Sequence, residues 1–109
     1  MKIYRVVFDP GAQEEALEAA EHIAKFAPTS AAKWFAGLEK LIESLHTMPG
    51  RCGKARESET LGTDLRQYIH HSHRVIFLIE EEAGIVRILH IRHSARRAIG
   101  ESQEQEEGQ

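Results

Sequence analysis

The side chains suited to chemistry are concentrated in the second half of the chain. Residues 51–100 hold nine of the 14 Lys and Arg residues and five of the seven His residues. Cutting RNA without a metal requires activation of a 2′-hydroxyl, stabilisation of charge on phosphorus and protonation of the leaving oxygen. Guanidinium groups suit the second task, and imidazoles suit the first or the third. For such a reaction we expect Arg66 and Arg74, on neighbouring strands, to hold the phosphate. His93 would do the acid–base work, and Arg96 would add positive charge.

Each of these residues also has a structural interpretation. Arg74 could be a strand residue that faces solvent or pairs with a nearby Glu, and the sequence leaves both roles open. For His93 we favour a structural hydrogen bond at the end of the last strand. Arg96 and Arg97 are typical of a solvated turn, from which they could contact an acidic segment of a partner.

A basic, Gly-rich loop, Gly50-Arg51-Cys52-Gly53-Lys54, lies near the middle of the chain. It is not a phosphate-binding loop, because the Gly-x4-Gly-Lys-Ser/Thr pattern is absent. It could still place Arg51, Lys54 and Arg56 against the backbone of a nucleic acid or against another target, with Arg97 as a further contact. A catalytic thiol needs a nearby base, so we favour a structural role for Cys52.

Three imidazoles gather at His70, His71 and His73. On one strand, His71 and His73 would point to one face and His70 to the other. A metal site needs further ligands at suitable spacing, and Cys52 and His90 could approach only through the fold. We therefore favour an exposed, titratable turn between two strands, and we expect neither a metal nor a cofactor.

The composition sets the broad class of the protein. A chain of 109 residues fits one domain, which we place at residues 1–99. No apolar run is long enough for a bilayer, no signal peptide is visible, and the single Cys excludes an internal disulfide, so we expect a cytoplasmic protein without membrane contact. The net charge of −3 combines +3 in residues 51–100 with −4 in residues 101–109, and we expect residues 100–109 to form an acidic disordered tail.

Hydrophobic periodicity predicts an α+β fold. Residues 3–8 are rich in β-branched and aromatic side chains and predict a strand. Asp9-Pro10 is typical of a helix start, and Pro28 predicts the end of that helix. A second apolar stripe predicts a helix over residues 31–45, which buries Trp34 and Phe35 and forms an antiparallel hairpin with the first. Strands at residues 65–71, 73–80 and 85–91 then form an antiparallel meander, with the helices on one face of the sheet.

This order, with particular residues, resembles the RelE/ParE superfamily of bacterial type II toxins. The resemblance runs from about Tyr4 to Arg97. It rests on the strand-to-helix segment 7–12, the Pro49-Gly50 helix exit and Leu65-Arg66, and above all on the segments 73–77 and 86–96 in this order and spacing. It implies a small plasmid-stabilisation-type toxin that is neutralised by an antitoxin encoded beside it.

The superfamily has two main activities, which share one fold. RelE-like members cut messenger RNA in the ribosomal A site, and ParE-like members inhibit DNA gyrase. Many RelE-like sequences carry a Tyr just beyond the position of His93, and here that stretch is Arg97-Ala98-Ile99-Gly100. This departure favours a ParE-like toxin. A ribosome-dependent mRNA endonuclease is the first alternative, and a non-toxic interaction module is the second.

Overall fold

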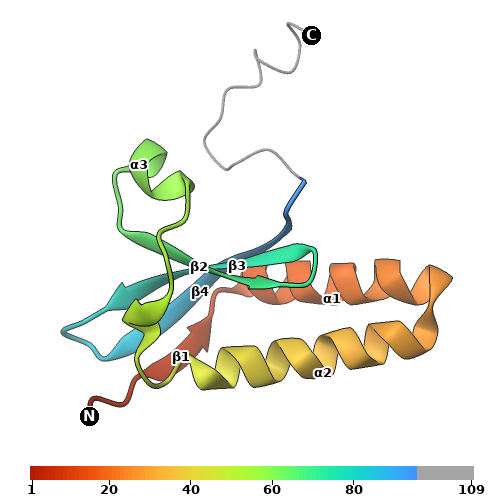
Figure 1. Ribbon diagram of the computed structural model, residues 1–109, viewed down its shortest axis with the longest axis horizontal. Helices are drawn as coiled ribbons and strands as arrows, with labels where there is room; N and C mark the ends of the chain where they lie inside the picture. Colours follow the sequence, from red (N-terminus) through yellow and green to blue (C-terminus); the bar gives the residue numbers. More distant parts are fainter. Residues whose placement is uncertain (96–109) are drawn as a thin grey trace, which may run out of the picture.

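The computed structural model describes residues 1–95. Arg96, Arg97 and the predicted acidic tail therefore lie outside the described residues. The elements follow one another in the order β1 (Arg5–Phe8), α1 (Pro10–Phe26), α2 (Pro28–Ser44), the 3-10 turn η1 (Pro49–Arg51), α3 (Glu57–Leu61), β2 (Leu65–His70), β3 (His73–Glu80) and β4 (Ile85–His93). Figure 1 shows this α+β arrangement, which confirms the predicted fold class.

The four strands form one sheet in the order β1-β4-β3-β2. The last three strands are the predicted antiparallel meander, and β1 joins it as a parallel neighbour of β4, with Arg5 opposite Ile85. The two central strands, β3 and β4, are the most apolar, as expected for strands covered on both faces. A β-bulge between Ile76 and Phe77 shifts the register of β3 against β4.

The two long helices form the predicted hairpin, and each begins with a proline. Pro10 and Pro28 occupy the first helical positions, where a missing N–H costs no hydrogen bond. Only Ala27 separates the helices, so α2 starts three residues before the predicted position at Ala31. Within residues 1–95, no helix combines the length and the apolar character that a membrane span requires.

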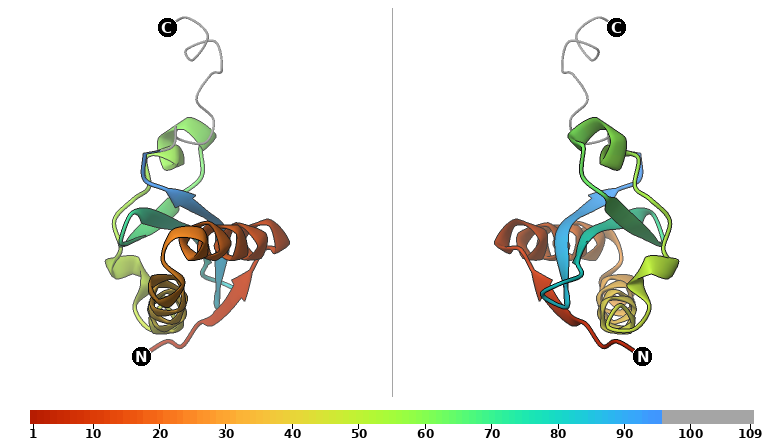
Figure 2. Two further views of the ribbon diagram at one scale, coloured as in Figure 1. Left: turned by 90° about the vertical axis from the view of Figure 1, so that its right-hand side faces the viewer. Right: turned by 90° about the vertical axis from the view of Figure 1, so that its left-hand side faces the viewer.

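The main core lies between this hairpin and one face of the sheet (Figure 2). Trp34 and Leu38 of α2 pack with Phe77 of β3 and Ile88 of β4, and all four side chains are buried. Burial of each such side chain stabilises the fold by about 1.5–3 kcal/mol. Phe35, predicted to be in the core, is only partly buried at its margin.

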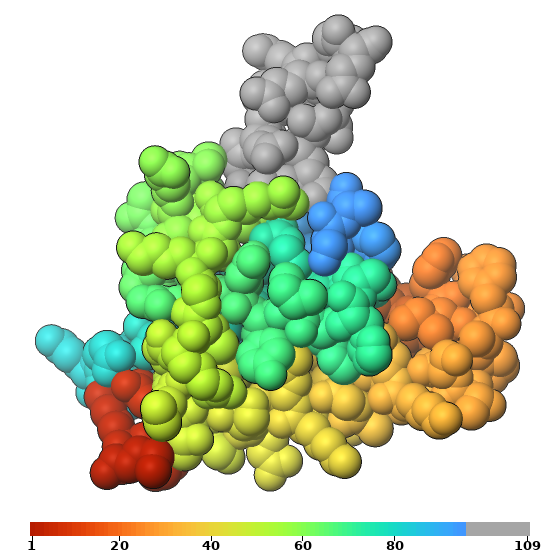
Figure 3. Space-filling model, viewed as in Figure 1, coloured from red at the N-terminus to blue at the C-terminus, as the bar shows by residue number. Residues whose placement is uncertain are grey.

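The segment 49–64 contains the predicted Gly-rich loop. Its Cys52 packs in the main core, and its later part, from Ala55 on, covers the opposite face of the sheet. Ala55 packs there against Leu65 and Ile76 in a second, smaller core. The segment also pairs with the edge of β2, because Ala55 N–H donates to Leu65 O at 2.8 Å and Gln67 N–H donates to Gly53 O at 3.0 Å. In Figure 3 this yellow-green segment lies beside β2 and β3. It positions several of the candidate site residues.

Candidate functional site

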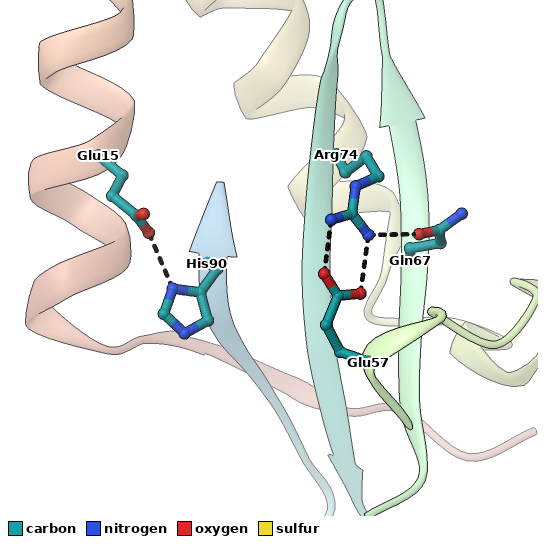
Figure 4. Close-up of polar contacts among 5 residues, drawn as sticks. All are labelled: Glu15, Glu57, Gln67, Arg74 and His90. Atoms are coloured by element: carbon teal, nitrogen blue, oxygen red, sulfur yellow. Dashed lines mark hydrogen bonds and ion pairs between the residues drawn. The ribbon is translucent and has the colours of Figure 1, made fainter. Parts of the chain in front are cut away.

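A buried ion pair joins α3 to the outer face of the sheet. The Arg74 guanidinium donates through Nη1 to Glu57 Oε1 at 2.8 Å and through Nη2 to Glu57 Oε2 at 2.6 Å. Nη1 also donates to Gln67 Oε1 at 3.0 Å (Figure 4). Arg74 is 4% exposed and Glu57 is 0% exposed. The hydrogen bonds to Glu57 raise the pKa of Arg74, although burial opposes them. Arg74 is therefore charged, shielded from solvent and already engaged by a carboxylate.

Arg66 lies on the other face of the sheet. Arg66 is paired with Phe77 of β3, and paired residues on neighbouring strands share a face of the sheet. Arg74 lies three positions, an odd number, before Phe77 on the same strand. Alternating side chains then point to opposite faces. The Arg66 guanidinium donates to Gly50 O at 3.2 Å and to Cys52 O at 2.8 Å, and it lies 3.5 Å from Asp64. The structure does not bring the two predicted phosphate-holding arginines together.

His93 ends β4 opposite His73, on the same side of the sheet as Arg66. Its side chain is exposed, and its Nδ1 accepts a hydrogen bond from Ala95 N–H at 3.0 Å. This is the kind of strand-end hydrogen bond that the structural interpretation expects. His93 is therefore separated from Arg74 by the sheet, and Arg96 and Arg97 lie outside the described residues.

The basic residues of the central loop divide into two groups. Arg51 closes the end of α2, because its guanidinium donates to Thr47 O at 2.8 Å and to Met48 O at 2.9 Å. Lys54 and Arg56 instead line a depression of about 380 Å³ with Arg74. Gln67, Ile69 and Ser94 complete its walls. The depression gathers three cationic side chains, and Arg74 among them is paired with Glu57.

Cys52 lies within the Gly-rich loop, and its side chain packs in the main core and is 8% exposed. Burial raises the pKa of its thiol, although Arg51 and Arg66 act in the opposite direction. A thiol held in its neutral form is a poor nucleophile. Across residues 1–95, no group of three or more His, Cys, Asp or Glu side chains is arranged to hold a metal ion.

The histidine cluster differs from its prediction. β2 ends at His70, and a two-residue turn of His71 and Ser72 leads into β3. His70 and His73 therefore pair across the strands and share a face, which corrects the expected grouping of His71 with His73. Of these three histidines only His71, in the turn, is exposed, whereas His70 is buried and His73 is partly buried. The sequence pattern does not reveal where one strand ends and the next begins.

The hairpin carries an open apolar groove of about 400 Å³ beside β1. Phe8, Leu17 and Phe35 line it, with Ala16, Leu38 and Ile42 below and Gln13, Glu39 and Glu43 along the rim. Leu17 is 50% exposed. The same stripes that predict core packing thus leave part of their apolar surface uncovered. Apolar surface of this kind, with a polar rim, is typical of a protein-binding site.

Comparison with known proteins then decides the family. The model of the "ParE toxin of type II toxin-antitoxin system, parDE" matches residues 6–98. The chain belongs to this ParE toxin family. The match spans β1 to β4, so the ParE assignment covers every element described above. No curated protein matches this ParE-family chain by sequence.

Solved structures agree with the ParE-family fold. The chromosomal ParDE toxin–antitoxin system from P. aeruginosa contains a chain that superposes with a TM-score of 0.68 at 17% identity, over 84% of this chain and 96% of that chain. The toxin–antitoxin complex RelBE2 from Mycobacterium tuberculosis contains one with a TM-score of 0.57 at 26% identity, over 88% and 97%. Similarity to both a ParE and a RelE system leaves the choice between the two activities to the site itself.

Proposed function

We propose that this ParE-family toxin stops growth by binding DNA gyrase in the cytoplasm, without a cofactor, and that a cognate antitoxin neutralises it. The observation that carries the proposal is the buried pair of Arg74 and Glu57. An RNA-cutting centre would need an Arg74 that is open to a phosphate and close to Arg66 and His93. The separation of these side chains supports action by binding rather than by cleavage.

A second candidate is a ribosome-dependent mRNA endonuclease. The depression that Lys54 and Arg56 share with Arg74 favours it, because clustered cations could stabilise charge on a phosphate. In that case Glu57 must release Arg74 when RNA binds.

Three measurements distinguish the candidates. Induction of the protein without an antitoxin should stop growth, and unaffected growth would favour a non-toxic interaction module. Purified protein should block supercoiling by gyrase. Mapping of transcript ends after induction should reveal no new cuts within ribosome-bound messages, and codon-periodic cuts would overturn the gyrase proposal in favour of the endonuclease.

We further propose that the groove between α1 and α2 receives the antitoxin. Both structural neighbours come from toxin–antitoxin systems. The groove offers Leu17 and Phe35 to apolar side chains, and Glu39 and Glu43 at its rim favour a segment that also carries Lys or Arg. An amphipathic helix that lies in such a groove is a recurring mode of recognition.

Two matched variants test this docking site. Leu17 is 50% exposed in the groove, and Leu61 is 47% exposed on α3. Leu17→Glu should abolish co-purification with the antitoxin, whereas Leu61→Glu should leave it intact. Equal retention of both variants would exclude the groove as the main contact.

A further inference from the structure

One end of the sheet carries an unusual concentration of imidazoles around Trp34, the single tryptophan. The Trp34 ring lies 5.0 Å from the His73 ring and 5.5 Å from the His70 ring, between ring centroids. His71 stacks edge-on against His70 at 4.6 Å, and His93 stacks against His73 at 5.2 Å. These four histidines, here called the histidine cluster, come from β2, the β2–β3 turn, β3 and β4. The proposed function uses none of their ring contacts.

His70 fastens this end of the sheet to α2. Its Nε2 lies 2.9 Å from the backbone oxygen of Trp34, so the ring nitrogen must carry the proton and donate it. The ring also fits against Gly37, where an added Cβ would lie 2.9 Å from His70 Cε1. The β2–β3 turn is therefore held to the helical hairpin by a buried imidazole and a ring contact with Trp34.

His73 occupies the least favourable position for a positive charge. Its Nδ1 is buried and has no hydrogen-bond partner among the described residues. Burial lowers the pKa of His73, and His93, His70 and His22 lower it further. The titratable groups that act on it are His22 on α1, His70 on β2 and His93 on β4. Lys33 on α2 lines a shallow depression with Trp34 and His71, and His71 contacts His70. Glu15, the carboxylate that α1 directs toward β4, is hydrogen-bonded to His90 (Figure 4).

We propose that the histidine cluster is a proton-operated release: in mildly acidic solution the His73 imidazole becomes charged at a position where its buried Nδ1 has no acceptor, its contact with the Trp34 ring is lost, and the β2–β3 turn separates from α2. The neutral His73 ring packs against Trp34 and His93, whereas a charged His73 ring lies 5.2 Å from the His93 ring and has a buried nitrogen that lacks an acceptor. This inference is independent of the gyrase and antitoxin proposals.

The sign of the pH dependence follows from proton linkage. His73 has a lower pKa in the folded state than in the unfolded state, so the unfolded state binds more protons between these two pKa values. The contribution to stability is complete above about pH 6.5, the ordinary pKa of His, and is lost as the pH falls toward the folded pKa. For each unit by which folding lowers the pKa of His73, the unfolding equilibrium constant becomes about tenfold larger at pH values below both pKa values.

The experiment compares urea denaturation at pH 7.5 and pH 5.5, followed by Trp34 fluorescence, in wild type, His73→Phe and a control, His46→Gln. His46 follows α2, outside the cluster. Wild type and His46→Gln should lose stability at the lower pH, and His73→Phe should lose less. Equal losses in all three proteins, or no loss in wild type, would overturn the proposal.

A second measurement protects the test if His73→Phe does not fold. NMR titration of the His73 ring protons in wild type should give a pKa below the ordinary value for His. His93→Gln, an exposed change, should move it upward because one like-charged neighbour is removed. An ordinary pKa in wild type, or an unchanged one in the variant, would contradict the proposal.

Discussion

Arg74 on β3 and Glu57 on α3 face each other as a bidentate pair with nitrogen–oxygen distances of 2.8 and 2.6 Å, both almost fully buried. This pair connects the segment 49–64 to the outer face of the sheet. The segment places few apolar side chains against that face. A buried pair of this kind contributes to stability mainly through the cost of leaving one charge alone.

Breaking this pair should therefore destabilise the fold strongly. Glu57→Gln and Arg74→Met should each lower the free energy of unfolding by about 3–5 kcal/mol, because each leaves a buried charge without its partner. The double variant Glu57→Gln with Arg74→Met should cost less than the sum of the two. Urea denaturation measures all three. Asp64→Asn is the control, because the Asp64 side chain is 58% exposed and its contact with Arg66 should contribute about 1 kcal/mol or less. Additive effects of the single changes would show that the pair acts as two independent groups.

Gly37→Ala should destabilise the protein although it improves helix propensity. The gain in propensity is about 1 kcal/mol. The new Cβ would lie 2.9 Å from His70 Cε1, and His70 is held by its bond to Trp34 O, so crowding should cost about 1–3 kcal/mol. Gly11→Ala in α1 meets no atom within 4 Å and should be neutral or slightly stabilising. Thermal denaturation of both variants checks the opposite signs, and a stabilised Gly37→Ala would mean that His70 is free to move.

Cys52 should be almost unreactive in the folded protein. The thiol is buried and its raised pKa reduces the thiolate fraction at neutral pH. The rate of labelling with a disulfide reagent should rise sharply in urea. Because the chain has a single cysteine, all of the labelling reports on Cys52. In the native state the rate should increase with pH beyond the range in which a free cysteine has levelled off. Fast labelling of the native protein would contradict the packing of Cys52 in the main core.

The ionised carboxylate of Glu80 should stabilise the fold, so this contribution should be present only at pH values above the range in which Glu80 becomes protonated. Its carboxylate accepts a hydrogen bond from Arg87 Nε at 2.5 Å, and this bond lowers the pKa of Glu80. The contribution is complete above the unfolded pKa of 4.5 and is lost as the pH falls through the folded value. Glu80→Gln should thus be less stable than wild type at pH 7, and the difference should vanish at about pH 3. Glu82→Gln, in the exposed β3–β4 turn, should show no such difference at either pH.

The main elements were predictable because their signals are local. The apolar stripes of the two helices and the prolines at positions 10 and 28 define the hairpin. The segment 49–64 has no such period, since α3 is only five residues long and is held by Ala55 and Glu57 rather than by an apolar stripe. The pairing of β1 with β4 depends on contacts about 80 residues apart, which no local pattern encodes.

The candidate site was harder to predict because it depends on register. Arg66 and Arg74 lie on neighbouring strands, as expected, but an odd offset in the β2–β3 pairing sends them to opposite faces. The turn at His71 sets that offset, and the sequence pattern allows the strand to continue through it. The Glu partner of Arg74 was one of the structural alternatives, but only the fold identifies it as Glu57.

The parallel pairing of β1 with β4 also determines at what point during synthesis the sheet can be completed. Arg5 emerges early in synthesis, yet its sheet neighbour Ile85 is made near the end of the described chain. Until then the N-terminal strand has no partner, and the hairpin has only part of a sheet to cover. Ordering such distant segments is slow relative to local folding, so a nascent chain keeps its core open during most of its translation. A truncated copy that lacks β4 has no strand between β1 and β3, so its N-terminal strand cannot join the sheet.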